Sequence, residues 1–335
     1  MDLQPITEAS TVRTKYRRNT APVTAILLGV AWTLSIAAGP TQAQEVPDDE
    51  EAIVDEEAKH AELVKAAQNP MATIISVPVQ NNTSFGIGAF GRTSNAMYFQ
   101  PVIPVRLSKS LDLINQTVLP VIAAPDVVVA APPGTELPRD PEACMRAAQS
   151  RFCGGAQLEA GTTWGLGDLT WTGLFTPANP GAVIVGVGPV LLFPTGTSDE
   201  TGSGKWGAGP SIGVVTMPGK MLLGLLANNI WSYAGDPERA DVNLLYLQYF
   251  INYNFPKGWY LTSSPIIASD WTKPASQGWI VPFGGGGGKV FKIGAQPIDG
   301  QIQVFYNAVT SKNEEGTRVG PEWSLRLQLQ LLFPK

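Results

Sequence analysis

The chain has 335 residues, of which only 15% are charged, with 23 Lys and Arg against 28 Asp and Glu. That charged fraction lies below the quarter usual for soluble domains, while Gly (35) and Pro (28) are abundant. No basic patch with interleaved aromatic residues appears, which argues against nucleic acid as a partner. The composition instead suits a β-barrel that presents an apolar surface to lipid.

The N-terminus has the pattern of a secretory signal peptide. Four basic residues between positions 13 and 18 precede an uncharged run over residues 21–38, and small residues at Thr41 and Ala43 occupy the positions that a signal peptidase reads. We therefore expect residues 1–43 to be a signal peptide that is cleaved after Ala43. An uncleaved inner-membrane anchor is the alternative, because eighteen uncharged residues can just span a bilayer.

An acidic leader, residues 44–70, follows the expected cleavage site. Residues 44–55 are acidic and nearly free of bulky apolar side chains, which predicts disorder. Residues 56–68 have helix-forming composition, and Pro70 stops the helix. Two interpretations stay open: the helix is a solvated periplasmic tail, which we favour, or its Ala and Val stripe enters the inner mouth of the barrel as a plug.

Residues 71–335 are predicted to form one all-β domain, an antiparallel transmembrane β-barrel of about twelve strands with the short N-terminal helix in front of it. The expected strands are 72–81, 94–106, 111–122, 164–175, 182–193, 205–216, 221–233, 242–254, 259–270, 278–291, 300–310 and 323–333.

The last of these strands gives the clearest signal. Between Trp323 and Phe333, apolar residues alternate with Ser324, Arg326, Gln328 and Gln330. A period of two means that one face is apolar and the other polar, and eleven residues is the length of a tilted strand that crosses a bilayer. In the strand over residues 221–233 the two faces do not sort neatly.

The connections alternate between short and long. The predicted inner links are short, at residues 108–110, 177–181, 218–219, 255–258 and 295–300. The predicted outer links are longer, at residues 81–94, 123–163, 195–204, 234–241, 272–277 and 311–321. Outer-membrane barrels have short periplasmic turns and long extracellular loops, whereas a two-sheet sandwich has no reason to follow this rule.

Aromatic residues are expected to form two belts at the strand ends, as they do at the headgroup layers of a membrane. The outer belt would contain Trp164, Trp206, Trp231, Tyr233, Trp271, Trp279 and Trp323. The inner belt would contain Phe175, Phe255, Trp259, Tyr260, Phe291 and Phe333.

The two cysteines, Cys144 and Cys153, are separated by eight residues in the long outer link 123–163. In an exported protein this spacing favours one disulfide that closes a surface loop, with two free thiols as the alternative. Two Cys and one distant His do not make a ligand set, so no metal site is expected.

Two features of the sequence could suggest catalysis, but neither supports an active site. Residues 283–290 (FGGGGGKV) lack the first Gly and the Ser or Thr of a phosphate-binding loop, so a glycine-rich strand that packs closely against luminal groups is the better interpretation. The sole histidine, His60, lies in the leader helix, which argues against a His-dependent nucleophile in the barrel wall. We expect no enzymatic activity and no cofactor.

Polar residues on the predicted inner face are the candidate functional residues. They are expected to line the lumen: Arg106, Asp168, Gln248, Asn252, Gln301, Gln303, Arg326 and Gln328. They either pair with one another and fill a narrow barrel or line a solute path and set its charge preference. The first function to consider is therefore a channel with a partly occluded lumen, and the second is a non-conducting structural or adhesive barrel whose outer loops bind a partner.

Several longer strings resemble a bacterial family of outer-membrane proteins. They include NPMATIISVPVQNN (69–82), GKWGAGP (204–210), LLYLQYFINYNFPKGWYLTSSPII (244–267) and LRLQLQLLFPK (325–335). Members of this family are labelled transporters, sometimes mislabelled neuromedin U, and are similar to barrels associated with meta-pathway phenol degradation. The resemblance implies a β-barrel and uptake of small, hydrophobic or aromatic molecules. It supplies no catalytic or ligand-binding residues.

Together these observations predict a protein of the cell outer membrane of a Gram-negative envelope. Its expected partners are outer-membrane lipid, a small-molecule solute and, during biogenesis, the barrel assembly machinery, whose recognition signal the last strand resembles.

Overall fold

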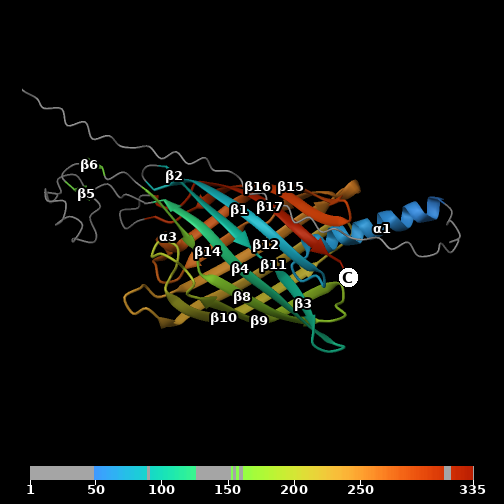
Figure 1. Ribbon diagram of the computed structural model, residues 1–335, viewed down its shortest axis with the longest axis horizontal. Helices are drawn as coiled ribbons and strands as arrows, with labels where there is room; N and C mark the ends of the chain where they lie inside the picture. The colour runs from blue at the N-terminus through green and yellow to red at the C-terminus, as the bar shows by residue number, and fades with distance from the viewer. Residues whose placement is uncertain are drawn as a thin grey trace, which may run out of the picture. The chain divides into compact units, whose positions relative to one another are not determined.

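Twelve transmembrane strands close an antiparallel barrel in the computed structural model, which describes residues 49–88, 91–125, 152–153, 156–157, 161–312 and 318–334 (Figure 1). Side chains of the leader helix are described from Glu57 onward. The unbroken strands are β1 (Ile75–Ile87), β4 (Leu111–Pro125), β9 (Val183–Phe193), β10 (Lys205–Thr216), β11 (Met221–Gly235), β12 (Asn243–Asn254), β15 (Trp279–Ile293), β16 (Gln296–Val309) and β17 (Trp323–Phe333).

The other three strands are each interrupted near the middle. They are β2 (Arg92–Phe99) with β3 (Val102–Arg106), β7 (Thr162–Leu166) with β8 (Leu169–Pro177), and β13 (Trp259–Ser263) with β14 (Ile266–Asp270). The breaks contain Pro101, Gly167 and Pro265. Proline has no N–H to donate to the ladder and glycine weakens a strand interior, so a break at these positions is expected. From the sequence, each pair is predicted to be one continuous strand.

One long helix, two short ones and a separate hairpin complete the described elements. These are α1 (Asp49–Gln68), η1 (Pro256–Gly258), α3 (Ala275–Gly278), and the pair β5 (Phe152–Cys153) and β6 (Ala156–Gln157). Because α1 begins at Asp49, the prediction of disorder over residues 44–55 is wrong from that residue onward. Within the described part of the chain, no helix combines the length and the apolar character needed to cross a membrane.

Every strand of the barrel pairs with its neighbours in sequence, and the last strand returns to the first. The closing ladder runs from Ile75 opposite Phe333 to Phe85 opposite Trp323. The opposite wall closes in the same way, because β11 pairs with β12 from Met221 to Trp231. All pairings are antiparallel, so no backbone edge in the described barrel is left without a partner strand, as a hydrocarbon environment requires.

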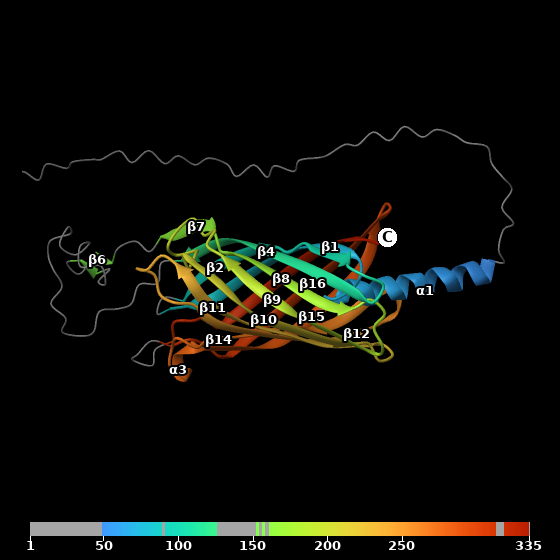
Figure 2. The same cartoon turned by 90° about the horizontal axis from the view of Figure 1, so that it is seen from below.

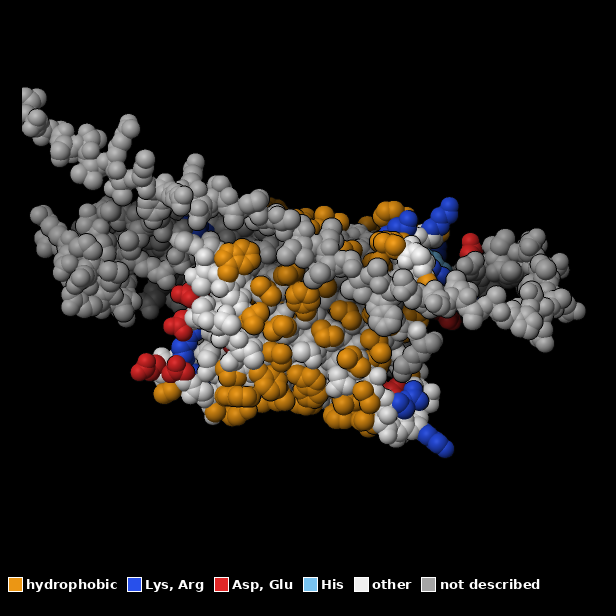
Figure 3. Space-filling view, viewed as in Figure 1, with side chains coloured by type: hydrophobic (Ala, Val, Ile, Leu, Met, Phe, Trp, Pro, Cys, Tyr) orange, Lys and Arg blue, Asp and Glu red, His pale blue; other side chains and the backbone are white. Residues whose placement is uncertain are grey.

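Alternation along β17 follows the prediction. Leu327 and Leu329 point outward and are 45% and 60% exposed, whereas Arg326 points into the lumen and is 6% exposed. On the face shown in Figure 3, apolar side chains cover the middle of the wall and charged side chains gather at its two ends. This distribution confirms the apolar outer wall that the composition predicted.

Aromatic side chains at the strand ends confirm most of the two belts. On the outer surface are Trp164, Trp206, Trp231, Tyr233, Trp271 and Trp323 towards one end, and Phe175, Phe255, Trp259 and Phe333 towards the other. Trp279 is half-buried beside Trp271, with ring centroids 5.5 Å apart. The assignment of Tyr260 to the inner belt is wrong, because its side chain is buried inside the barrel.

The links between strands alternate as predicted, with one large correction. Helix α1 and the C-terminus lie at the same end of the barrel, which we call the inner end; the other is the outer end (Figures 1 and 2). The predicted outer loop over residues 81–94 is mostly strand, because β1 runs to Ile87 and β2 starts at Arg92. Its polar residues bond across the two strands, with Asn81 Nδ2 2.9 Å from Asn95 Oδ1. Similarly, the predicted inner link 295–300 shrinks to residues 294–295.

Candidate functional site: a two-sided, plugged lumen

The barrel encloses two adjoining cavities. The outer cavity has a volume of about 610 Å³ and the inner one about 140 Å³. Where they meet, both are lined by the same six residues, five polar ones and one isoleucine. We call these six the polar belt: Gln80, Gln100, Gln116, Gln248, Ile266 and Arg326. Gln100 and Gln248 lie on opposite walls of the barrel, since they belong to the β2–β3 strand and to β12. The polar belt therefore divides the lumen into two chambers.

The lumen also has two sides. We call the inward faces of β16, β17, β1 and β2 with Tyr260 the polar arc, because they carry mainly amides, hydroxyls, Arg326 and Asp299. We call the inward faces of β9, β10, β11 and the outer half of β12 the apolar arc. Its buried side chains are Ile184, Val190, Leu192, Val215, Leu222 and Ile230, and the half-buried Leu244 packs beside them. A solute in the lumen would therefore have an apolar wall on one side and hydrogen-bonding groups on the other.

The apolar arc explains why residues 221–233 did not sort into two faces. In β11, Leu222, Leu226 and Ile230 point inward while Leu223 and Leu225 point outward. Both faces of this strand are apolar, because one contacts the hydrophobic side of the lumen and the other faces the surroundings of the barrel. The period-two signal is lost in such a strand even though the strand is regular.

The polar arc is held by a hydrogen-bond network around the break between β13 and β14. Ser264 donates its N–H to Gln303 Oε1 at 3.1 Å, and the Gln303 amide donates back to Ser264 Oγ at 2.9 Å. Arg326 Nη1 donates to the Ser264 carbonyl at 2.8 Å, and its Nε donates to Asn82 Oδ1 at 3.3 Å. The interrupted strand thus turns backbone groups towards luminal side chains instead of towards β15.

The glycine-rich strand makes room for a second buried contact. Tyr260 donates its hydroxyl to Asp299 Oδ1 at 2.7 Å, although one strand, β15, lies between them. The ring crosses β15 at Gly288, where an added Cβ would lie 2.3 Å from the tyrosine ring. This close packing confirms the interpretation of residues 283–290 as a strand that packs tightly against luminal groups.

The inner end is filled by the chain that precedes β1, and we call residues 63–72 the plug. Val64 and Ala67 of α1 are buried against Tyr260, Val290 and Leu332. Gln330 Nε2 donates to the Ala67 carbonyl at 3.2 Å, and Gln68 Nε2 donates to Asn254 Oδ1 at 2.7 Å. The favoured prediction of a solvated tail is therefore wrong for this part of the leader, and the alternative of a plug is confirmed.

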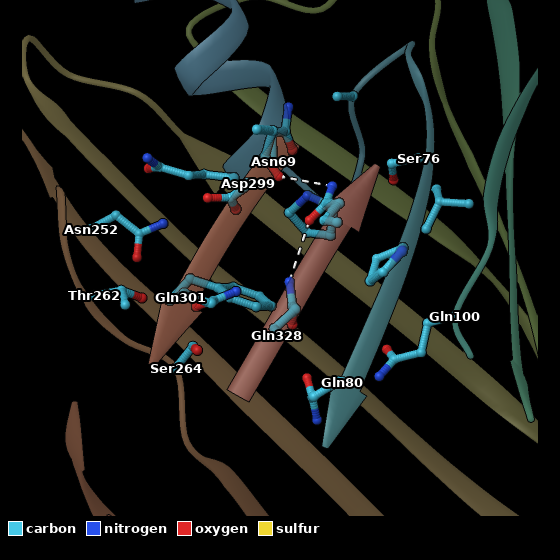
Figure 4. Close-up of a pocket in the computed structure, with 18 of the residues that line it drawn as sticks. Asn69, Ser76, Gln80, Gln100, Asn252, Thr262, Ser264, Asp299, Gln301 and Gln328 are labelled. Carbon is cyan, nitrogen blue, oxygen red and sulfur yellow. Dashed lines mark hydrogen bonds between the residues drawn. The ribbon is translucent and has the colours of Figure 1, made fainter. Parts of the chain in front are cut away.

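The plug spans the lumen from the polar arc to the apolar arc. Asn69 Oδ1 accepts the Met71 N–H at 2.9 Å and turns the chain after the helix. Met71 then packs in the apolar arc with Ile184, Val215 and Leu222. Gly186 and Gly213 provide the space, since a Cβ on either would lie 2.9 Å from Met71 Sδ. Figure 4 shows polar side chains below the end of α1, with Asn252 and Thr262 on one side and Gln80 and Gln100 on the other.

The outer mouth is braced by Asp168 in the break between β7 and β8. Its carboxylate accepts the Gly196 N–H at 3.0 Å, and the N–H and hydroxyl of Ser203 at 2.6 and 2.5 Å. Nearby, the hydrogen bond from Lys205 Nζ and then that from Ser232 hold the pKa of the Asp241 carboxyl below its ordinary value. The Asp168 contacts fix the loop between β9 and β10 at the outer chamber, and the Lys205 contact joins the start of β10 to the loop between β11 and β12.

The predicted luminal residues fall into four places. Gln248, Asn252, Gln301, Arg326 and Gln328 line the inner cavity, and Asp168 lines the outer one. Gln303 is buried behind the cavity wall, bonded to Ser264 and Gln301. Arg106 points to the inner rim, outside both cavities, and forms an ion pair with the buried Asp112. Whether any of them lines a solute path stays a prediction.

Four residues that line the inner cavity were not predicted to do so: Gln80, Gln116, Tyr260 and Asp299. Gln80 and Gln116 occupy inward positions of β1 and β4, so the same alternation that selected Gln248 could have found them. Asp299 was assigned to a turn, because Pro297 and Gly300 surround it.

Cys144 lies outside the described residues, so the disulfide with Cys153 stays a prediction, as does the signal peptide over residues 1–43. Among the described residues, no group of three or more His, Cys, Asp and Glu side chains is arranged to hold a metal ion.

A closed antiparallel barrel of twelve strands with an apolar outer wall is a barrel of the kind found in the bacterial outer membrane. No family model and no curated protein matches the sequence. Among solved structures, an outer-membrane channel from Pseudomonas putida F1 is 19% identical, with a TM-score of 0.51 over 78% of this chain and 94% of that one.

Two further structures are less similar. The NanC porin is 10% identical with a TM-score of 0.43, over 77% of this chain and 98% of that one. The CymD monoaromatic hydrocarbon channel is 9% identical with a TM-score of 0.40, over 83% of this chain and 93% of that one. The likeness to the Pseudomonas putida structure shows that the two chains share a fold, a β-barrel of the outer-membrane type.

Proposed function

We propose that this protein is an outer-membrane channel through which small solutes, hydrophobic or aromatic ones among them, pass by way of a partly occluded lumen. The observation that carries the proposal is the pair of adjoining cavities inside a closed barrel, divided by the polar belt and filled at the inner end by the plug. The volume of the outer cavity lies within the range of small-molecule sites, and its apolar arc suits a solute with an apolar face. No histidine lies in the barrel, and the proposal includes no catalytic step.

The plug supplies the test. Val64 and Met71 are 4% and 2% exposed and each packs among apolar side chains. Replacing both with glutamate (Val64→Glu with Met71→Glu) buries two unpaired charges, so the plug should leave the lumen. We expect single-channel conductance in planar bilayers to rise severalfold over that of the unsubstituted protein.

The control is Ala61→Glu, which places one such charge at an exposed position of α1 and should leave conductance unchanged. A membrane that stays sealed with both the unsubstituted protein and the double variant would refute the channel. That result would favour a structural or adhesive barrel whose outer loops bind a partner.

A further inference from the structure

Arg326 is a buried cation whose protein partners are all neutral. Its side chain is 6% exposed, at the polar belt between the two cavities. Nε and Nη1 donate to Asn82 and Ser264, and the guanidinium carbon lies 5.0 Å from the centroid of the Phe305 ring. Nη2 makes no hydrogen bond to any other described residue. Two donors of the guanidinium are therefore left for something in the lumen.

The two acidic residues that line these cavities do not neutralise it. Asp168 is occupied by Gly196 and Ser203 at the outer mouth. Asp299 accepts from Tyr260 and lies four residues along β16 from Gln303, the residue opposite Arg326, which is about 13 Å in a strand. No described carboxylate lies within ion-pair distance of the Arg326 guanidinium. A buried guanidinium without a counter-charge is costly unless an anion pairs with it.

The outer chamber above Arg326 has a polar side, with Asn82, Ser84 and Ser324, and an apolar side. Phe305, Ile266 and Leu244 line the outer chamber together with the apolar arc, so an anion bound at Arg326 would have hydrocarbon contacts on its outer side. We infer that Arg326 binds a carboxylate and that the outer chamber takes small amphipathic monocarboxylates, with the carboxylate on the guanidinium and the apolar part against the apolar arc. This inference rests on the proposed channel function for entry of the ligand and names the class of solute that it admits.

The test is binding, which does not depend on transport. Isothermal titration calorimetry on the folded protein in a non-ionic detergent, at neutral pH, would compare benzoate with benzamide and with acetate. Benzamide keeps the ring without the charge, and acetate keeps the charge without the ring. We expect benzoate to bind at least about tenfold more tightly than benzamide, since a charge-assisted hydrogen bond contributes that much. It should also bind at least about tenfold more tightly than acetate, which has no ring to bury against the apolar arc.

Substitution at Arg326 assigns the effect to one residue. Arg326→Gln should reduce benzoate affinity about tenfold or more and remove the preference over benzamide, while Arg326→Lys should keep part of it as a point charge. The matched control is Arg318→Gln, which removes one positive charge from a half-exposed ion pair with Glu322 outside both cavities and should not change benzoate affinity.

The inference is overturned if benzoate binds no more tightly than benzamide, or if acetate binds as well as benzoate. It is also overturned if folded Arg326→Gln keeps the affinity of the unsubstituted protein. Should Arg326→Gln not fold, the comparison of the three ligands on the unsubstituted protein decides alone. Failure of this test leaves the conductance of the plug variant unaffected, so the channel and its ligand class can fail separately.

Discussion

The two arcs of the lumen solve the same problem, filling a barrel, with opposite chemistry. The apolar arc is filled by ordinary hydrophobic packing, and Met71 enters it as one more core side chain. The polar arc needs a partner for each buried donor and acceptor, as the Tyr260–Asp299 and Ser264–Gln303 contacts show. Packing tolerates approximate fit, whereas an unpaired buried polar group costs its full desolvation. Substitutions that remove a hydrogen-bond partner should therefore cost more stability in the polar arc. Substitutions that add a charge should cost more in the apolar arc.

The largest expected effect comes from placing one charge on each arc in turn. Leu222 is fully buried in the apolar arc, so Leu222→Glu should destabilise the barrel by more than about 3 kcal/mol or prevent it from forming. Gln328→Glu places the same carboxylate on the half-buried polar arc and should cost less than about 1 kcal/mol. Guanidinium unfolding in lipid vesicles, followed by tryptophan fluorescence, measures both. Equal losses would mean that the lumen is not two-sided.

The next largest effect is expected in the polar arc, where the Tyr260 ring packs against Gly288. Gly288→Ala would place a methyl group against the Tyr260 ring and should destabilise the barrel by about 1–3 kcal/mol. Gly300→Ala is the control, because its added Cβ would make ordinary contacts, 3.5 Å from Leu329 Cδ2 and from Phe291 Cε1. The same unfolding measurement applies. A cost at Gly300 as large as that at Gly288 would show that glycine serves strand geometry in general rather than the Tyr260 contact.

The smallest expected effect isolates one hydrogen bond. Tyr260→Phe keeps the ring but leaves buried Asp299 without its donor, so a loss of about 1–2 kcal/mol is expected. Tyr306→Phe is the matched control, since Tyr306 packs beside Trp323 with ring centroids 4.8 Å apart and its hydroxyl bonds to no described residue. No loss in Tyr260→Phe relative to this control would mean that the Asp299 contact contributes nothing to stability.

How far the sequence predicts this barrel depends on whether a residue's role is local. The alternation of β17 and the loop lengths are local properties, and they gave the strand number and the outward face correctly. The inward role of Tyr260 depends on Asp299, 39 residues later, and on a glycine between them on another strand. A tyrosine next to Trp259 at a strand end looks like part of an aromatic belt until that partner is known.

Polar strand ends show the same limit. Residues 81–87 and 296–300 contain the Asn, Ser, Gly, Pro and Asp that normally mark turns, and both segments proved to be strand. In a barrel with a polar arc such residues face the lumen or each other, so the usual turn signal fails there. For the candidate site, the alternation of inward and outward side chains along the strands correctly placed five of the eight predicted residues at the inner cavity. It could not show that Arg106 would instead pair with Asp112 at the rim.

The plug also imposes an order in time on assembly. Its residues come before the first strand, yet the groups that hold its helix lie on β12, β13, β15 and β17. The hydrogen bond from Gln330 to Ala67 joins residues 263 positions apart. Until the last strand has been delivered to the membrane, α1 has no completed surface to dock against. Contacts of such long range form late because loop closure comes first. The helix that leads the chain should therefore be the last element to reach its final place, after the β1–β17 ladder has closed.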